Sequence, residues 1–405
     1  MKLSIDQMAS VDSEILKRVR ATPGVSRIEL SRDLQIAPST VSNYVGRLIS
    51  DGFLVESEKV ENEGGRPPTA LRLDPDGGQF IGVDFEARNI MAMAVDFSDR
   101  PLKQAHRSIL ETDSVAAIIA KLEDAIPEVL PENPERLLAI GVGVPGLVDP
   151  DRGVAVHYKY INNWREVALA APLAARFGVP VFLENNIRSI TLAELWFGQG
   201  RGGRDWLCVG IRSGIGAGIV AGGQLQRGAH YRAGEIGRWR CPHPLLATAR
   251  FFATGDAPSE TELQEVSSVR AVIRALERAR KESKKSVLSA HPEPLVFADV
   301  VRAVQQRDAL ATHVIGVAAE MLGWAVGQLV LALNPDRVIL AGPLTLLGDA
   351  LLDPLRARAE KILVASGAEV PPILNSTLGE FSGALGAAAL AVHEWKPARE
   401  PAGRK

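Results

Sequence analysis

The chain has 405 residues, of which 46% are apolar, so it can bury two or three cores of ordinary size. Its formal net charge is only −2, with 46 Lys and Arg against 48 Asp and Glu, which excludes a global attraction to nucleic acid or anionic lipid. Two cysteines exclude a disulfide framework, and the charged start MKLSIDQMASVDSEILKRVR lacks the apolar stretch of a secretory signal, so we expect a cytoplasmic protein.

Three short bursts of apolar residues at helical spacing occupy the beginning of the chain. They predict helices over 11–21, 27–34 and 38–51, with only a few residues between the last two. This spacing is typical of a helix-turn-helix. Pro38 suits the first turn of the third helix, because its missing N–H would be unpaired there in any case.

Short polar side chains at the start of the third helix can reach base edges and phosphates in a major groove. The following stretch, GFLVESEKVENEGGRPPTALRL, predicts two strands around a glycine-rich turn, which is a wing with Arg66 at its tip for a minor groove or a backbone. The alternative is a three-helix domain for protein contacts, because acidic and basic residues of this segment nearly cancel. The combined pattern favours DNA binding. The residues expected at the duplex are Ser39, Thr40, Ser42, Asn43, Arg47 and Arg66.

The pattern of apolar residues changes near residue 75. From there, β-rich runs such as QFIGVDF, VPVFLEN and RVILAGP alternate with helical ones, which predicts an α/β domain of sheets covered by helices. The most apolar long segment, 314–333, carries Glu320 and Gln328, so we expect a buried or amphipathic helix and no membrane span. The charged run ERARKESKK predicts a solvated helix face or loop.

Six strings in this second part resemble, in kind and order, those of the ROK family of sugar kinases and sugar-responsive repressors. They are GVGVPGLVD, LENNIRSITLAELWFGQGRG, SGIGAGIV, GAHYRAGEIG, LNPDRVILAGP and LGEFSGALGAAAL, and the similarity covers 80–392. The resemblance implies an α/β protein with an N-terminal winged helix-turn-helix and a two-lobed, actin-like and ribonuclease H-like sugar-kinase fold. The expected domains are 1–75 and 76–405, with lobe one over 78–195 and 380–396 and lobe two over 196–379.

The first phosphate loop departs from that of the family's kinases. Their D-x-G-G-T is DFEARN here, so Glu86, Ala87 and Arg88 replace two glycines and a threonine. A carboxylate at Glu86 would face phosphate anions and fill space that glycine leaves free, which disfavours ATP. The second loop, SGIGAG at 213–218, is intact, and either a tight glycine hairpin or residual anion binding explains it.

The catalytic base is also replaced. The kinases carry E-N-D, whose aspartate accepts the proton of the attacking sugar hydroxyl, whereas this chain has Glu184, Asn185 and Asn186. An amide accepts a hydrogen bond but no proton near neutral pH, and losing a positioned base costs on the order of a hundred- to ten-thousand-fold in rate. We therefore expect no catalytic residue, no phosphoryl transfer and no cofactor, while both amides can still bind sugar hydroxyls.

The family's zinc cluster is altered as well. In place of E-x-G-H and several cysteines, the chain has Glu235, Arg238 and the single thiol of Cys241. Cys241 and His243 cannot supply four ligands, so we expect no metal. Arg238 has two interpretations, since it can receive an anionic sugar derivative or pair with Glu235 or another acid inside a remodelled loop.

Together these features predict a repressor of carbohydrate metabolism that binds a double-stranded DNA operator as a homodimer and senses a sugar or sugar derivative through an inactive kinase-like domain. One alternative is an active ATP-dependent sugar kinase with a regulatory head. Another is a regulator that takes its signal from a protein partner. The residues expected at the sugar are Gly146, Asn185, Asn186, Glu235 and Arg238.

Overall fold

The structure, a computed structural model, describes residues 5–57, 69–86, 88–241, 250–252, 261–283, 285–291 and 294–397. The chain divides into two compact units, which are described one at a time. Unit 1 is Met1–Glu184 with Ala387–Lys405, and unit 2 is Asn185–Gly386. Unit 1 therefore holds both the helix-turn-helix and the first α/β sheet, and the predicted domain boundaries stay predictions.

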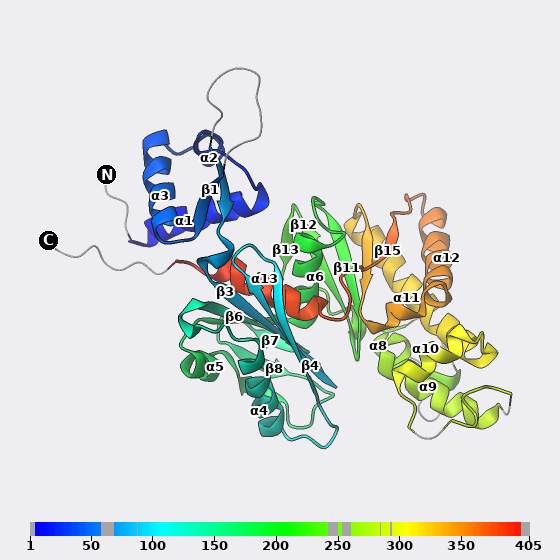
Figure 1. Cartoon of the computed structure of the whole chain (residues 1–405). Helices are drawn as coiled ribbons and strands as arrows, with labels where there is room; N and C mark the ends of the chain where they lie inside the picture. The colour runs from blue at the N-terminus through cyan, green and yellow to red at the C-terminus, as the bar shows by residue number, and fades with distance from the viewer. Residues whose placement is uncertain are drawn as a thin grey trace. The chain divides into compact units, whose positions relative to one another are not determined.

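Unit 1 begins with a winged helix-turn-helix, which we call the head (Figure 1). Its helices are α1 (Ile5–Ala21), α2 (Arg27–Leu34) and α3 (Pro38–Ser50), and its strands β1 (Leu54–Ser57) and β2 (Ala70–Leu73) pair antiparallel. A capping box starts α2, because the Ser26 hydroxyl accepts from the Glu29 N–H at 3.3 Å while the Ser26 N–H donates to the Glu29 carboxylate at 2.7 Å. The predicted helix-turn-helix is confirmed.

The rest of unit 1 is built on a five-stranded sheet of order β10-β6-β3-β4-β5. The antiparallel strands β3 and β4 are buried along almost their whole length, which explains their continuous apolar runs, and β6 runs parallel to β3. Helix α4 (Val115–Ala125) packs against β4 and β5. The strands are β3 (Gln79–Phe85), β4 (Asn89–Asp96), β5 (Pro101–Ser108), β6 (Leu137–Val144) and β10 (Val181–Asn185).

Two further elements complete unit 1. A small sheet of order β7-β8-β9 is formed by β7 (Leu147–Asp149), β8 (Val154–His157) and β9 (Arg165–Ala168), and α5 (Ala170–Phe177) follows it. The last helix, α13 (Ser382–Glu394), approaches β6 so closely that a Cβ at Gly141 would lie 1.8 Å from the Ala387 carbonyl oxygen. Only glycine permits this contact.

Unit 2 is built on a second five-stranded sheet, of order β13-β12-β11-β14-β15. Strands β11, β12 and β13 form an antiparallel meander, and β14 and β15 continue the sheet in parallel with β11. Helix α6 (Asn186–Phe197) packs against β11 and β12. The strands are β11 (Trp206–Ile211), β12 (Ile215–Ala221), β13 (Gln224–Gln226), β14 (Val338–Ala341) and β15 (Ile373–Asn375).

The helical part of unit 2 is organised around α11 (Ala309–Leu333). In the described part of the chain this is the one helix long and apolar enough to cross a membrane, yet 67% of its most apolar window is buried inside the fold. It packs against α12, where a Cβ at Gly323 would lie 2.3 Å from the Leu355 carbonyl oxygen. It is therefore a core helix, as expected. Its neighbours are α8 (Gln264–Ser267), α9 (Val269–Glu282), α10 (Phe297–Gln305) and α12 (Asp349–Ala365).

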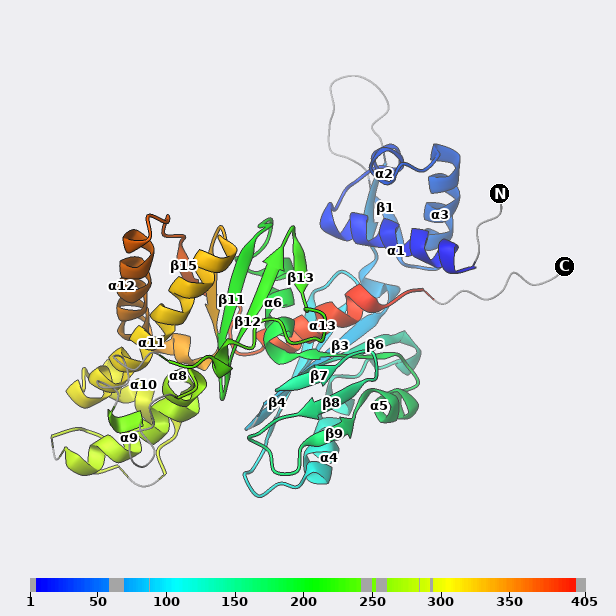
Figure 2. The ribbon, with the colours of Figure 1, turned by 180° about the vertical axis from the view of Figure 1, so that it is seen from behind.

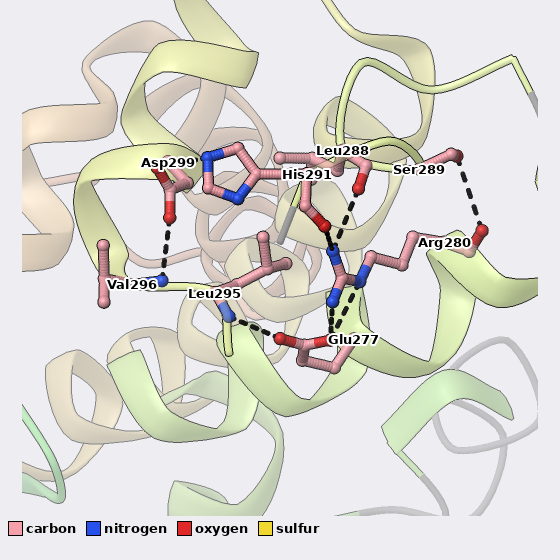
Figure 3. A network of polar contacts seen from close by, with 8 residues as sticks. All are labelled: Glu277, Arg280, Leu288, Ser289, His291, Leu295, Val296 and Asp299. Carbon is pink, nitrogen blue, oxygen red and sulfur yellow. Dashed lines mark hydrogen bonds and ion pairs between the residues drawn. The ribbon is translucent and has the colours of Figure 1, made fainter. Parts of the chain in front are cut away.

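A buried arginine holds the connection between α9 and α10 (Figure 3). Arg280 Nε donates to Glu277 Oε2 at 2.8 Å, and Arg280 Nη1 donates to the carbonyl oxygens of Leu288 at 3.1 Å and His291 at 2.7 Å. His291 in turn lies 3.0 Å from Asp299 of α10. Arg280 belongs to the run ERARKESKK, so the prediction that this run is solvated is wrong for Arg280, whose guanidinium satisfies loop carbonyls that would otherwise be buried unpaired.

Candidate functional site

Helix α3 has one apolar and one polar face. Val41, Tyr44, Val45 and Leu48 are buried, at the spacing that places side chains on one side of a helix. Pro38 opens the helix after Ala37, so no side chain caps it, and its first N–H groups point outward, where water or a phosphate can accept from them. The predicted DNA contacts on the other face are Ser39, Ser42 and Asn43, which are exposed, and Thr40, which is half-buried.

Arg47 stands at the far end of that polar face. Its guanidinium donates to the buried carboxylate of Asp12 in α1 at 2.7 Å and lies 4.7 Å from the centroid of the Tyr44 ring. The side chain still keeps 41% of its surface exposed. Arg47 therefore ties α3 to α1 and faces solvent as well, and its contact with DNA stays a prediction. Arg66 lies outside the described residues.

Asn185 and Asn186 lie at the junction of β10 and α6, and both are buried. The Asn185 side-chain oxygen accepts from the N–H groups of Ile187 at 2.9 Å and Arg188 at 3.3 Å, so Asn185 is the N-cap of α6. Asn186 is the first residue of the helix. This capping role was not predicted, although an Asn directly before a helix is a recognisable signal for it.

The segment after β13 is shaped by residues in the left-handed region. Gly228, Tyr231 and Gly234 have φ of 74°, 56° and 83°. A Cβ at Gly234 would lie 1.7 Å from the Ala217 carbonyl oxygen, and the Ala217 N–H donates to the Gly234 carbonyl at 2.8 Å, which holds this loop against β12. Arg188 of α6 donates to the Tyr231 carbonyl at 3.1 Å. The loop and the start of α6 thus form one site in unit 2.

Glu235 and Arg238 stand at the end of this loop, around the short 3-10 helix η4 (Ile236–Arg238). Burial raises the pKa of the Glu235 carboxyl, and the positive charges of Arg238, Arg188 and Arg232 oppose that rise. Arg238 Nε lies 3.6 Å from the Glu235 carboxylate, which is too far for a hydrogen bond, and 51% of the Arg238 side chain is exposed. The pairing with Glu235 is therefore observed but loose, and an anionic ligand at Arg238 stays a prediction.

Gly146 belongs to unit 1 and lies two residues after the end of β6. Its φ is 78°, and a Cβ there would lie 2.3 Å from the His157 carbonyl oxygen, so glycine is required. Nearby, Trp164 is buried with its ring centroid 5.2 Å from that of Phe85. Trp164 is a packing anchor, and the contact of Gly146 with a sugar stays a prediction.

The two loops that resemble phosphate loops have different structures. In the first, the Glu86 N–H donates to the Asn89 carbonyl at 2.9 Å and Arg88 pairs with Glu111 at the surface, while Ala87 lies outside the described residues. The second, 213–218, is the hairpin between β11 and β12.

Packing explains two of the three glycines in this string. A Cβ would lie 3.1 Å from the Ile187 side chain at Gly216 and 1.8 Å from Thr191 Oγ1 at Gly218. The close approach of α6 therefore accounts for Gly216 and Gly218 without an anion, and nucleotide binding there stays a prediction.

The described residues contain no group of three His, Cys, Asp or Glu side chains that could share a metal ion. Cys241 is buried, and burial raises the pKa of its thiol to about 12, so this thiol stays protonated at neutral pH. His243 lies outside the described residues.

Comparison with known proteins separates the two parts of the chain. The ROK family model matches residues 80–394, and a winged helix-turn-helix DNA-binding model matches 8–55. The DNA-binding transcriptional dual regulator NagC of Escherichia coli strain K12 is 26% identical over 96% of this chain and 93% of its own. A glucokinase of Halalkalibacterium halodurans is 28% identical over 76% of this chain and 93% of its own. The crystal structure of a ROK family transcriptional regulator, a homologue of the E. coli MLC protein, aligns over 96% of this chain and 97% of its own with a TM-score of 0.76 at 20% identity.

Proposed function

Because the chain belongs to the ROK family and carries a winged helix-turn-helix, we propose that it is a cytoplasmic transcriptional repressor of carbohydrate metabolism that senses a sugar or sugar derivative. The head is the observation that carries this proposal. The relative that matches 96% of the chain is named a transcriptional regulator, whereas the glucokinase matches 76% of the chain.

On DNA, α3 is the recognition helix. The exposed side chains of Ser39, Ser42 and Asn43 reach base edges in the major groove, and the uncapped N–H groups at the start of α3 approach a phosphate. A homodimer presents two such helices to two half-sites one helical turn or a multiple of it apart. Replacing Asn43 by alanine removes a base contact and costs about 1–3 kcal/mol of operator affinity.

In unit 2, the effector site is formed by Asn185, Asn186, Glu235 and Arg238. The amides and the carboxylate bind sugar hydroxyls, and the exposed guanidinium donates hydrogen bonds to an acidic group where the effector has one. The sugar alters repression only by binding one arrangement of the protein better than the other.

The kinase-like domain has no phosphoryl-transfer activity in this proposal. Asn186 stands where a base is needed. Glu86 stands where a kinase needs a glycine, and Arg88, which pairs with Glu111, stands where it needs a threonine. The rival function is an active sugar kinase with a regulatory head.

One set of measurements on the purified full-length protein tests the proposal. A genome-wide footprint should recover discrete operators with paired half-sites, and genes beside them name the pathway. Thermal shift against neutral sugars, sugar phosphates and sugar acids should single out one class, and no sugar should stimulate ADP release from ATP. Sugar-dependent ADP release at rates typical of kinases, on the order of 1–100 per second, establishes the rival. No shift with any sugar class favours a protein partner as the signal.

A further inference from the structure

Within unit 1, four aromatic rings join the head to the first α/β sheet. Phe53 follows α3, Phe80 lies in β3, Phe97 follows β4 and Trp395 follows α13. The Trp395 centroid lies 5.4 Å from that of Phe53, 5.7 Å from Phe80 and 5.8 Å from Phe97, and Phe53 stacks on Phe97 at 5.1 Å. These distances are typical of favourable aromatic pairs. We call this set of four rings the aromatic joint.

An ion pair between Arg20 and Asp99 connects α1 to the aromatic joint. Arg20, in the last turn of α1, donates from Nε to Asp99 Oδ2 at 2.8 Å and from Nη2 to the Phe97 carbonyl at 3.0 Å. Its guanidinium carbon lies 5.5 Å from the centroid of the Phe97 ring. The two side chains are only 13% and 10% exposed. Such a pair resists separation, because either partner alone would be left as a buried, uncompensated charge.

Backbone contacts add to this connection. The Asp74 N–H, just beyond β2, donates to the Phe53 carbonyl at 3.0 Å. A Cβ at Gly77 would lie 2.8 Å from the Gly52 carbonyl oxygen. The base of the head is therefore packed on the first α/β sheet of unit 1 through aromatic rings, an ion pair and backbone contacts. A flexible tether would not provide these contacts.

Helix α13 supplies Trp395 and is held tightly at two points. Its Gly386, in unit 2, faces α6, since a Cβ there would lie 1.8 Å from the Ser189 carbonyl oxygen. One residue later, in unit 1, Ala387 meets Gly141 of β6 with the same closeness. In both views of unit 1 the end of α13 lies beside the base of the head (Figures 1 and 2).

We propose that the aromatic joint and the Arg20–Asp99 pair fix the orientation of the head on the first α/β sheet, so that α3 is presented to DNA at a set angle. The presentation to DNA rests on the proposed function, whereas the fixed orientation does not.

Hydrogen–deuterium exchange on the full-length protein tests the fixed orientation. Trp395→Ala should speed exchange of the amides around Phe53 and Phe97 by about ten-fold or more, because three ring contacts are lost. Trp395→Phe should stay near wild type. Trp324→Ala is the matched control, since it removes a half-buried indole from α11 in unit 2 and should leave the head unchanged. Unchanged exchange around Phe53 in Trp395→Ala, or equal loosening in the control, overturns the proposal.

Half-site spacing on DNA tests whether the fixed head governs DNA binding. With operators selected from a random pool by the wild-type protein, moving the half-sites by about five base pairs, half a helical turn, should cost a protein with fixed heads at least about ten-fold in affinity. Trp395→Ala should lose most of that discrimination and Trp395→Phe should keep it. Full discrimination in Trp395→Ala, or none in the wild type, refutes this role in DNA binding. If the pool yields no operator, the proposed function fails, and the exchange experiment still decides whether the joint fixes the head.

Discussion

Two ion pairs of this protein differ in their burial. Arg20 and Asp99 meet at 2.8 Å with 13% and 10% of their side chains exposed, while Arg238 and Glu235 stand 3.6 Å apart with 51% and 30% exposed. We call them the closed pair and the open pair. The closed pair has exchanged most of its water for protein, so breaking it leaves a buried charge, whereas the open pair keeps water around its guanidinium. The comparison shows that burial, more than the identity of the residues, decides whether an ion pair can fasten two elements together.

Breaking the closed pair should produce the largest effect. Arg20→Ala leaves the Asp99 carboxylate buried, so the free energy of unfolding should fall by about 3 kcal/mol, at the lower end for such pairs because Asp99 can take up a proton instead. Urea unfolding at pH 7.5 measures it. The double variant Arg20→Met with Asp99→Asn removes both charges and should recover most of the loss, since Asn tolerates the left-handed φ of 69° at residue 99. A loss of less than about 0.5 kcal/mol, the usual scale of a surface site, would show that the pair is not a fastener.

The pH dependence of stability sharpens the same contrast. Desolvation raises the pKa of Asp99 to about 6 from an ordinary value of 3.8, although Arg20 opposes the rise. The folded state therefore holds this proton more tightly than the unfolded state. The resulting stabilisation is complete below about pH 4 and is lost as the pH rises through 6.

The size of this change follows from the pKa. Between pH 4 and 7 the wild type should lose about 2 kcal/mol relative to Asp99→Asn, which is most of the roughly 3 kcal/mol that the whole shift is worth at about 1.4 kcal/mol for each unit of pKa. Unfolding curves of both proteins across this range supply the difference. If the wild type instead gains stability relative to Asp99→Asn as the pH rises, the assignment to Asp99 is contradicted.

The cap beside the open pair should give an intermediate effect. Asn185→Ala removes the acceptor for the Ile187 and Arg188 N–H groups and should cost about 1 kcal/mol of stability, whereas Asn185→Ser keeps a capping oxygen and should cost only a few tenths. Thermal shift with the identified effector then separates two roles. If the serine variant is stable but blind to the effector, Asn185 binds the sugar in addition to capping. If it responds normally, capping is its whole role.

Breaking the open pair, Arg238–Glu235, should change stability least. Arg238→Gln should alter the free energy of unfolding by less than about 0.5 kcal/mol, because exposed pairs are screened by water. If the effector is acidic, the same variant should bind it about ten-fold or more weakly, the scale of a charge-assisted hydrogen bond, while neutral sugars bind unchanged. Isothermal titration calorimetry measures the affinities for the acidic effector and for neutral sugars. A large loss of stability in Arg238→Gln would place this pair with Arg20 and Asp99.

Sequence patterns predicted those helices and strands whose formation depends on neighbouring residues alone. The helical spacing of Val41, Tyr44, Val45 and Leu48 is present in the letters of α3, and so is the strand-and-glycine string that became the hairpin over 213–218. The candidate site was predicted as a set of residue types. Its geometry was not, because the loop around Glu235 depends on Tyr231 and Gly234 adopting left-handed φ and packing on β12.

Contacts between residues far apart in the chain were not predicted, because they depend on how the intervening segments fold. Arg280 lies in a run of charges that predicts solvent exposure, and only the fold of the α9–α10 connection places two carbonyl oxygens on its guanidinium. Phe53 and Trp395 carry no mark that assigns them to one cluster, since their chain separation is set by everything folded between them.

By itself, therefore, the sequence determined the winged helix-turn-helix and the ROK family, because helical periodicity and short motifs are properties of residues and short windows. The tertiary structure alone decided which ion pair is closed and which is open, and which rings seat the head. Those depend on burial, and the burial of a side chain is decided by segments far away in the chain.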